Sequence, residues 1–432
     1  MCNLAKKAIE FGYATKILVS GKLVAPNDIP YLLLHDHVSH SRISLRLKIL
    51  EKFRRLMCAV FFSRTLRNKI LKSIWIKEFS KKKREIFDVI KKEKPSAVFV
   101  YGDRHGGYEP ALLKICYDLD IPTVIPPIAF ASEEENLLKS SRVGNKTKNE
   151  LRVTSNFNFK NRYPEQWRHD NLTGEDVTNY PDWQVEVMDE LGVLSSCPWT
   201  LGCGKSSVIQ AEGEEARDRF IKNGVPPEKI KVTGHSEHDN LLKVFLNKKE
   251  KRSELINKYD LENLPILIIS LPQLWEHNLL SESEHFTLQE KLCSDSVKLN
   301  CNVLLSMHPK MLKKNYLFLE EKYKVTIMEE RLNEVLPIAD VYIVGQGSTT
   351  IPWAILCEVP LVILDWYGLN YRYYNWIKGK VVVKKEKYFY HTIKTLTDSK
   401  EELNEMKSLH SFQKHLVSPF DGHCTKRILN FV

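Results

Sequence analysis

Glycines and hydroxyl side chains follow an apolar run in the segment DVYIVGQGSTTIP at 340–352. Glycines allow a ligand to approach the backbone, and hydroxyl groups together with free N–H groups at a helix start bind phosphate oxygens. Alternatively, Ser348 only caps the following helix. No GK[ST] sequence follows, so the segment is not a Walker A loop. The segment predicts a phosphate-binding loop made by Gly345, Gln346, Gly347, Ser348, Thr349 and Thr350.

A second candidate is SMHPKM at 306–311, where a histidine ends an apolar run. Pro309 stops the strand, so we expect His308 to point beyond the strand end, with Lys310 close by. An imidazole can bind a phosphate or a ribose hydroxyl. A single histidine at a strand end can also be purely structural.

The segment YGDRHGGYEP at 101–110 places a carboxylate at the end of a third apolar run. Asp103 could act as a general base if burial raises its pKa. His105 is the alternative base. The simpler explanation is that Asp103 holds a turn.

Two further segments bring polar side chains to strand ends. TGHSEHDN at 233–240 contains His235 and Glu237, and LPQLWEHN at 271–278 contains Gln273, Glu276 and His277. The histidine and acid spacing matches no common zinc pattern, so we expect no metal site. We expect these side chains to contact a ligand bound between two lobes.

The elements that carry these motifs alternate between short apolar runs and helical segments. Such alternation is typical of parallel sheets with helices on both faces. We therefore predict two doubly wound, Rossmann-like α/β lobes, spanning 1–240 and 241–432, with a last helix that crosses back. In such folds ligands bind beyond the carboxyl ends of the strands, so the cleft between the lobes is the expected site. The predicted strands are 96–103, 121–127, 229–234, 265–270, 302–308, 324–328, 340–345 and 360–365.

Two stretches of the first lobe do not fit this alternation. Residues 41–95 are helical in pattern and basic, and residues 131–204 are polar and without a clear period, as in an insertion. The net charge of the chain is +10, but residues 42–94 alone carry 18 Lys and Arg against five acids. The rest of the chain is therefore close to neutral. A solvated helix face, an anionic membrane surface and an anionic acceptor are the open explanations, whereas charge without a matching motif does not indicate nucleic-acid binding.

The nine cysteines are scattered and form no CxxC pair, which favours free thiols in a reducing compartment. The amino-terminal residues lack the continuous apolar stretch of a signal peptide. No apolar run approaches the roughly 20 residues that a spanning helix needs. We expect a cytoplasmic protein that is either free or peripheral on the inner membrane face.

Several of these segments resemble the GT-B superfamily of nucleotide-sugar glycosyltransferases and UDP-N-acetylglucosamine 2-epimerases. VYGDRHGGYEPALLKICYDLDIPTVIPP is similar to an epimerase segment, KIKVTGHSEHD to the hinge of both groups, and SPFDGHCTKRI to their tail. LLSMHPKM and ADVYIVGQGSTTIPWAILCEVPLVILD resemble bacterial CDP-glycerol phosphotransferases, sialyltransferases and capsule Kdo transferases. In that subset the resemblance implies that His308, Ser348 and Thr349 hold the donor phosphates.

The resemblance implies a glycosyltransferase that moves a sugar from a nucleotide-activated donor to a glycan or lipid-linked acceptor, with no further cofactor. Asp103 or His105 would deprotonate the acceptor. A UDP-sugar 2-epimerase or nucleotide-sugar hydrolase is the first alternative. The epimerase carboxylate and His-Arg-Arg segments are replaced here by PPIAFASEEE and PQLWEHN. A non-catalytic scaffold on the same fold is the second alternative.

Overall fold

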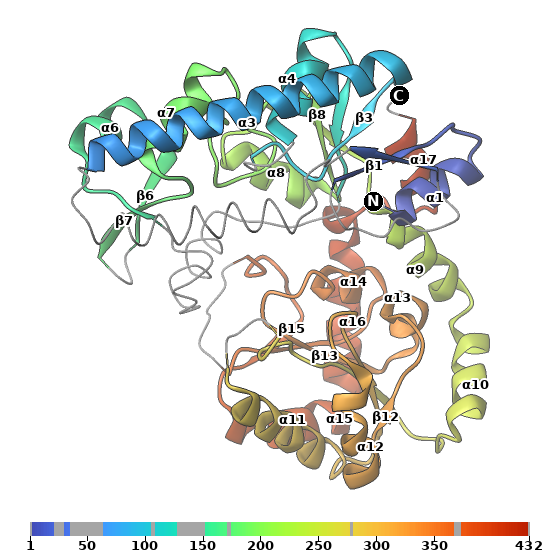
Figure 1. The fold of residues 1–432 in the computed structure, drawn as a ribbon. Coiled ribbons are helices and arrows are strands. Elements are labelled where there is room, and N and C mark those ends of the chain that lie inside the picture. Colours follow the sequence, from blue (N-terminus) through green and yellow to red (C-terminus); the bar gives the residue numbers. More distant parts are fainter. Residues whose placement is uncertain are drawn as a thin grey trace.

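The computed structural model describes residues 2–20, 30–34, 64–104, 109–127, 152–170, 174–276, 280–366 and 373–430. Figure 1 shows two α/β lobes, one above the other, with the two chain ends close together on the upper lobe. Each lobe contains a parallel sheet, as the alternating sequence pattern predicts. The predicted fold class is confirmed.

The second lobe contains a six-stranded parallel sheet in the order β12-β11-β10-β13-β14-β15. Numbered along the lobe, this order is 3-2-1-4-5-6, which is the order of the dinucleotide-binding Rossmann fold. The order in which successive strands are added to the sheet therefore reverses between β10 and β13. The strands are β10 (Ile266–Ser270), β11 (Asn302–Ser306), β12 (Thr326–Ile327), β13 (Val341–Gly345), β14 (Leu361–Leu364) and β15 (Lys380–Val383).

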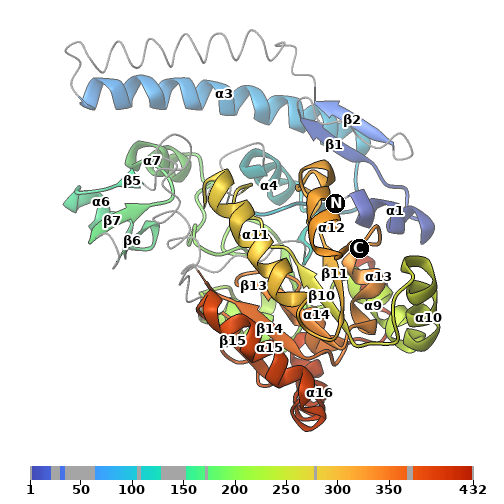
Figure 2. The same ribbon diagram turned by 90° about the horizontal axis from the view of Figure 1, so that it is seen from below.

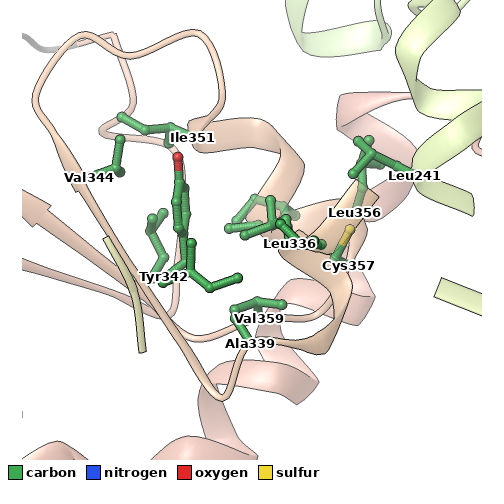
Figure 3. Packing of buried hydrophobic residues seen from close by; sticks show 14 of the residues in the cluster. Leu241, Leu336, Ala339, Tyr342, Val344, Ile351, Leu356, Cys357 and Val359 are labelled. Atoms are coloured by element: carbon green, nitrogen blue, oxygen red, sulfur yellow. The ribbon is translucent and has the colours of Figure 1, made fainter. Parts of the chain in front are cut away.

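Both faces of this sheet are covered by helices, because successive side chains of a strand point to opposite faces. Ile268 and Tyr342 belong to one buried cluster, while their neighbours Ile269 and Ile343 belong to another on the opposite face. Figure 3 shows Tyr342 in the first cluster, among aliphatic side chains. The helices are α11 (Glu282–Ser296), α12 (Leu317–Tyr323), α13 (Leu332–Val335), α14 (Ile351–Leu356), α15 (Phe389–Asp398) and α16 (Lys400–Val417).

The first lobe contains a four-stranded parallel sheet whose strands follow chain order, β3-β4-β8-β9. A separate parallel pair, β1 with β2, lies near the amino terminus. The strands are β1 (Ile17–Ser20), β2 (Tyr31–Leu34), β3 (Val98–Phe99), β4 (Thr123–Ile125), β8 (Val208–Ala211) and β9 (Ile230–Val232). The helices are α1 (Cys2–Glu10), α3 (Arg64–Glu93), α4 (Glu109–Asp118) and α8 (Glu214–Lys222). α8 ends just before Gly224, whose φ of +90° is typical of a glycine that follows a helix end.

The predicted irregular insertion is folded in its described parts, 152–170 and 174–204. It contains α6 (Phe157–Arg162), α7 (Asp182–Glu190) and an antiparallel sheet of β5 (Arg152–Val153), β7 (Glu175–Thr178) and β6 (Trp167–Asp170). The missing apolar period of this region therefore does not mean that regular structure is missing there. Its strands have two to four residues and mostly polar side chains, so they carry no apolar period.

The basic segment is described only from residue 64 onward, where it forms the single long helix α3. This helix packs on α4 and α7 and lies along one side of the first lobe (Figures 1 and 2). None of the described helices is long and apolar enough to cross a membrane. Residues 41–63 lie outside the described residues.

Three elements connect the lobes. α9 (Ser236–Leu246) and α10 (Lys248–Tyr259) lead from the first lobe into the second, and the predicted boundary at residue 240 falls inside α9. The last helix, α17 (Cys424–Leu429), returns and packs on α1 and α9. Asp239 of α9 holds the start of α17, because its carboxylate accepts the N–H groups of Cys424 and Thr425, both at 2.8 Å.

We predict that Asp239→Ala lowers the free energy of unfolding by about 1–2 kcal/mol, because two N–H groups at the start of α17 lose a charged acceptor. Urea unfolding followed by circular dichroism measures the change. Asp218→Ala, which removes an exposed carboxylate of α8, is the control and should change stability by less than about 0.5 kcal/mol. Equal effects of both substitutions would contradict the role assigned to Asp239.

Candidate functional site

Three neighbouring strands of the second lobe end at one edge of the sheet. β10 pairs with β11 on one side and with β13 on the other, so that Ser270 lies beside Ser306 and Val344. The loops 271–276, 307–310 and 346–350 continue from these strand ends. The strand order reverses between the neighbouring strands β10 and β13. In open α/β sheets, ligands bind beyond the carboxyl ends of the strands at this point.

A chain of hydroxyl groups connects the two strands that flank this point. The Tyr342 hydroxyl lies 2.8 Å from Ser270 Oγ and 2.6 Å from Thr350 Oγ1, and Thr350 Oγ1 lies 2.8 Å from Ser348 Oγ. Burial raises the pKa of Tyr342 to about 12, so the hydroxyl stays protonated at neutral pH. In Figure 3 the Tyr342 oxygen points toward Ile351, the first residue of α14. The 346–350 loop is thus anchored from the core of the lobe.

Gly345, which ends β13, and Gly347, which lies in the 346–350 loop, are needed for different reasons. A Cβ on Gly345 would lie 3.2 Å from Pro272 Cβ, so the close approach of the 271–276 loop favours glycine. Gly347 has a φ of +83°, which side chains rarely adopt. Ser348 Oγ accepts the Thr350 N–H at 3.3 Å within the loop, and the residue at the cap position of α14 is Thr350. The alternative that Ser348 caps α14 is therefore not what the structure shows.

His308 lies on the neighbouring loop, after β11. Its Nδ1 accepts the Lys310 N–H at 3.1 Å, so a neutral ring carries its proton on Nε2. Burial lowers the pKa of His308, the Lys310 charge lowers it further, and Glu276 opposes both. The imidazole is therefore neutral at pH 7 and offers Nε2–H as a donor. The Lys310 side chain is exposed at the same edge.

The loop after β10 adds acceptors to this edge. Glu276 accepts a hydrogen bond from the Tyr316 hydroxyl through Oε1, while its Oε2 and the Gln273 Oε1 are buried without a partner among the described residues. Both side chains therefore carry an acceptor that no described residue uses. Two predicted site residues, His105 and His277, lie outside the described residues.

His235 and Glu237 are used at the connection between the lobes. His235 Nδ1 accepts the Glu237 N–H at 3.1 Å at the start of α9, and burial lowers the pKa of His235 to about 4. The Glu237 carboxylate accepts a hydrogen bond from Asn333 of α13. These contacts hold α9 in place. They do not support the prediction that His235 and Glu237 contact a ligand between the lobes. In the described part of the chain, no three His, Cys, Asp or Glu side chains gather as metal ligands.

Asp103 is buried and its carboxylate is surrounded by donors. It accepts the N–H groups of Gly202 and Gly204 at 2.9 and 2.8 Å and the Ser206 hydroxyl at 2.6 Å, and Lys229 Nζ lies 3.6 Å away. A general base must reach its substrate. Asp103 instead holds the 202–206 loop, which is the turn-holding alternative, and we do not retain it as the base.

A hollow between the lobes brings together residues that the sequence does not place side by side. From the first lobe it is lined by Glu212, Glu215 and Arg219 at the end of β8 and in α8, and from the second lobe by Tyr373 and Trp376 among others. We call it the inter-lobe hollow. Arg219 pairs with Glu215, and its guanidinium lies 4.1 Å from the centre of the Tyr373 ring. Burial raises the pKa of Glu212 to about 7.

The inter-lobe hollow adjoins the 346–350 loop. Tyr374, which also lines the hollow, donates a hydrogen bond from its hydroxyl to the Ser348 carbonyl at 2.7 Å. Glu212 follows directly after a buried parallel strand, so its position at a carboxyl strand end is the signal by which sequence analysis could have found it. The partners from residues 373–376 carry no comparable signal.

The fold is that of a two-lobed α/β protein, and the polar loops at the edge of its Rossmann-like lobe form a candidate ligand site. The sequence matches no protein-family profile, and it matches no curated protein. Several solved structures are similar in fold. Among them, the UDP-GlcNAc 2-epimerase of Methanocaldococcus jannaschii is 14% identical, with 99% of this chain and 94% of that chain covered and a TM-score of 0.46.

Two other similar structures are the wall teichoic acid polymerase TagF and HepE of Anabaena in complex with UDP and glucose. TagF is 13% identical, with 86% of this chain and 97% of that chain covered and a TM-score of 0.48. HepE is 11% identical, with 81% and 80% covered and a TM-score of 0.43. The fold assignment of this chain rests on its own strand order.

We predict that Asp103→Ala lowers the free energy of unfolding by about 3–5 kcal/mol, because it leaves the partly buried Lys229 without its carboxylate and three donors without an acceptor. Urea unfolding measures the loss. Asp118→Ala, which removes an exposed carboxylate paired with Lys114, is the matched control and should cost less than about 0.5 kcal/mol. A stable Asp103→Ala protein would contradict the structural role.

Proposed function

We propose that the protein is a glycosyltransferase that takes a sugar from a nucleotide-activated donor and passes it to a glycan or lipid-linked acceptor. The observation that carries the proposal is the 3-2-1-4-5-6 strand order of the second lobe, with polar loops at the point where the order reverses. That point binds nucleotides in folds of this order. The nucleotide sugar is a substrate, and the scheme assigns no role to a metal or to a further cofactor.

The donor phosphates would lie between His308 and the 346–350 loop. His308 Nε2–H and the Ser348 hydroxyl, at the end of the hydroxyl chain, can donate hydrogen bonds to phosphate oxygens, and Lys310 adds a positive charge. These groups stabilise the negative charge that develops on the departing nucleotide. Gln273 and Glu276 have acceptors available for hydroxyl groups of the sugar or the ribose.

We predict that UDP, CDP or CMP binds the protein, and that His308→Ala and Ser348→Ala each weaken binding by about tenfold or more, since each removes a hydrogen bond to a charged phosphate. Isothermal titration calorimetry measures the affinities. His415→Ala on α16 and Ser253→Ala on α10, both at exposed positions, are the controls. Unchanged affinity in the His308 and Ser348 variants would contradict the proposed donor site.

Incubation of the protein with nucleotides and nucleotide sugars distinguishes the glycosyltransferase from the two alternative functions. Conversion of UDP-N-acetylglucosamine without an acceptor would identify a 2-epimerase or a nucleotide-sugar hydrolase instead of a transferase. A folded protein that binds none of the nucleotides would identify a non-catalytic scaffold. Nucleotide release that depends on an added acceptor is the result that the proposal expects.

We further propose that α3 attaches the protein to an anionic membrane surface on the cytoplasmic side. Leu66, Ile70 and Ile74 are 38–42% exposed and follow one another at four-residue spacing on the same helix face. Exposed cations continue along the C-terminal part of the helix, among them Lys77 and Arg84. Apolar side chains beside cations are the combination that binds the interface of an anionic bilayer.

We predict that Lys77→Glu/Arg84→Glu reduces binding to vesicles containing phosphatidylserine by about tenfold or more, since each cation near such a surface contributes about 1 kcal/mol. Vesicle flotation measures the bound fraction, and added salt should reduce it as well. Lys243→Glu/Lys249→Glu changes the net charge equally but on α9 and α10, and is the control. Equal losses in both variants would show that net charge, and not α3, determines binding.

A further inference from the structure

Glu212 is one of two carboxylates among the described residues that line the inter-lobe hollow. It directly follows β8, at the carboxyl end of a parallel strand, and precedes α8. No hydrogen bond to its carboxylate comes from the residues that the structure describes, in contrast to the four donors around Asp103. Two hollows meet at it, since Glu212, Ala216 and Arg219 line both the inter-lobe hollow and an adjoining one beside Pro126 at the end of β4.

The groups around Glu212 are suited to a sugar. The aromatic side chains of Tyr373 and Trp376 line the hollow from the second lobe, and the Trp376 indole N–H is buried without a partner in the described part of the chain. Rings with a polar tip bind amphipathic molecules such as sugars. Pairing with Arg219 holds Glu215 next to Glu212.

Glu212 is also close to the proposed phosphate site. Tyr374 joins the two, because its side chain lines the hollow while its hydroxyl binds the Ser348 carbonyl. An acceptor in the hollow would therefore lie beside a donor held at the 346–350 loop. Among the described residues, the titratable groups that line the hollow with Glu212 are Glu215 and Arg219 of α8 and Tyr373 and Tyr374 of the second lobe. α14 and α16 contribute Pro352, Leu416 and Val417.

We propose that the inter-lobe hollow is the acceptor site and that Glu212 is the catalytic base. The Glu212 carboxylate takes the proton of the acceptor hydroxyl while that oxygen bonds to the anomeric carbon of the donor. The bond from this carbon to the nucleotide phosphate breaks, and its electron pair remains on the phosphate oxygen. The inference rests on the proposed function. It assigns the acceptor and the proton transfer to residues that are distinct from the donor loops.

The charge state of Glu212 suits this role. Burial raises its pKa to about 7, with Arg219 lowering it and Glu215 raising it. A base with a pKa near the working pH is the most effective. Because the base must be ionised, kcat/KM should rise with pH through about 7. Glu215→Gln removes a like charge and frees Arg219, so it should move this rise to lower pH.

The test compares Glu212→Gln with Glu214→Gln, which removes the neighbouring, exposed carboxylate paired with Arg217. The donor that binds in calorimetry is incubated with methyl glycosides as acceptors, and nucleotide release is followed. We expect Glu212→Gln to bind nucleotide within about twofold of the wild type and to lose about 100-fold or more in kcat. Glu214→Gln should keep the wild-type rate and pH profile.

A second measurement needs no turnover. In protein labelled with 13C at the glutamate carboxyl groups, one signal should titrate near pH 7, vanish in Glu212→Gln and persist in Glu214→Gln. If Glu212→Gln does not fold, Glu212→Asp is tested instead. Its side chain is one methylene shorter, so its carboxylate lies farther from the acceptor, and we expect a larger loss in kcat than in donor affinity. A wild-type protein that binds no nucleotide would overturn the proposed function. A wild-type protein that turns over donor, with Glu212→Gln equally active or Glu212 titrating near 4.5, would overturn this inference alone.

Discussion

The parallel pairing of β10 with β11 on one side and with β13 on the other determines where everything else in the second lobe lies. Parallel strands end at the same edge, so three loops that are far apart in the chain converge there. The pairing itself depends on apolar side chains that alternate between two helix layers. A one-residue shift of β13 would turn Tyr342 and its hydroxyl chain to the other face of the sheet.

Three carboxylates of residues 1–240 serve two different purposes. Asp103 and Asp239 accept backbone N–H groups and stabilise the architecture, one holding the 202–206 loop and the other the start of α17. Glu212 has no such task, and it stands in a hollow that both lobes line. These carboxylates are thus of two kinds, and the number of donors around each distinguishes them.

The hydroxyl chain from Ser270 to Ser348 links the core of the second lobe to its exposed loop. Tyr342 is fully buried, so its hydroxyl needs partners inside the lobe, and Ser270 and Thr350 provide them. Tyr374 then ties the same loop to the inter-lobe hollow. A loop held from both sides can keep its donor groups aligned before a ligand arrives, which reduces the cost of binding.

The sequence by itself determined the α/β class, five of the six strand positions of the second lobe and the placement of His308 and the 345–350 segment at strand ends. The sixth strand, β15, was not predicted. Short apolar runs followed by glycine, proline or hydroxyl residues are local signals, so they can be recognised in the sequence without knowledge of the tertiary structure. The polar strands β6 and β7 carry no such signal and were not predicted. Only the tertiary structure decided that Asp103 is saturated by donors, that His235 and Glu237 serve the connection between the lobes, and that Glu212 meets Tyr373. Those facts depend on contacts between segments separated by about 100 residues or more along the chain, and no local pattern encodes them.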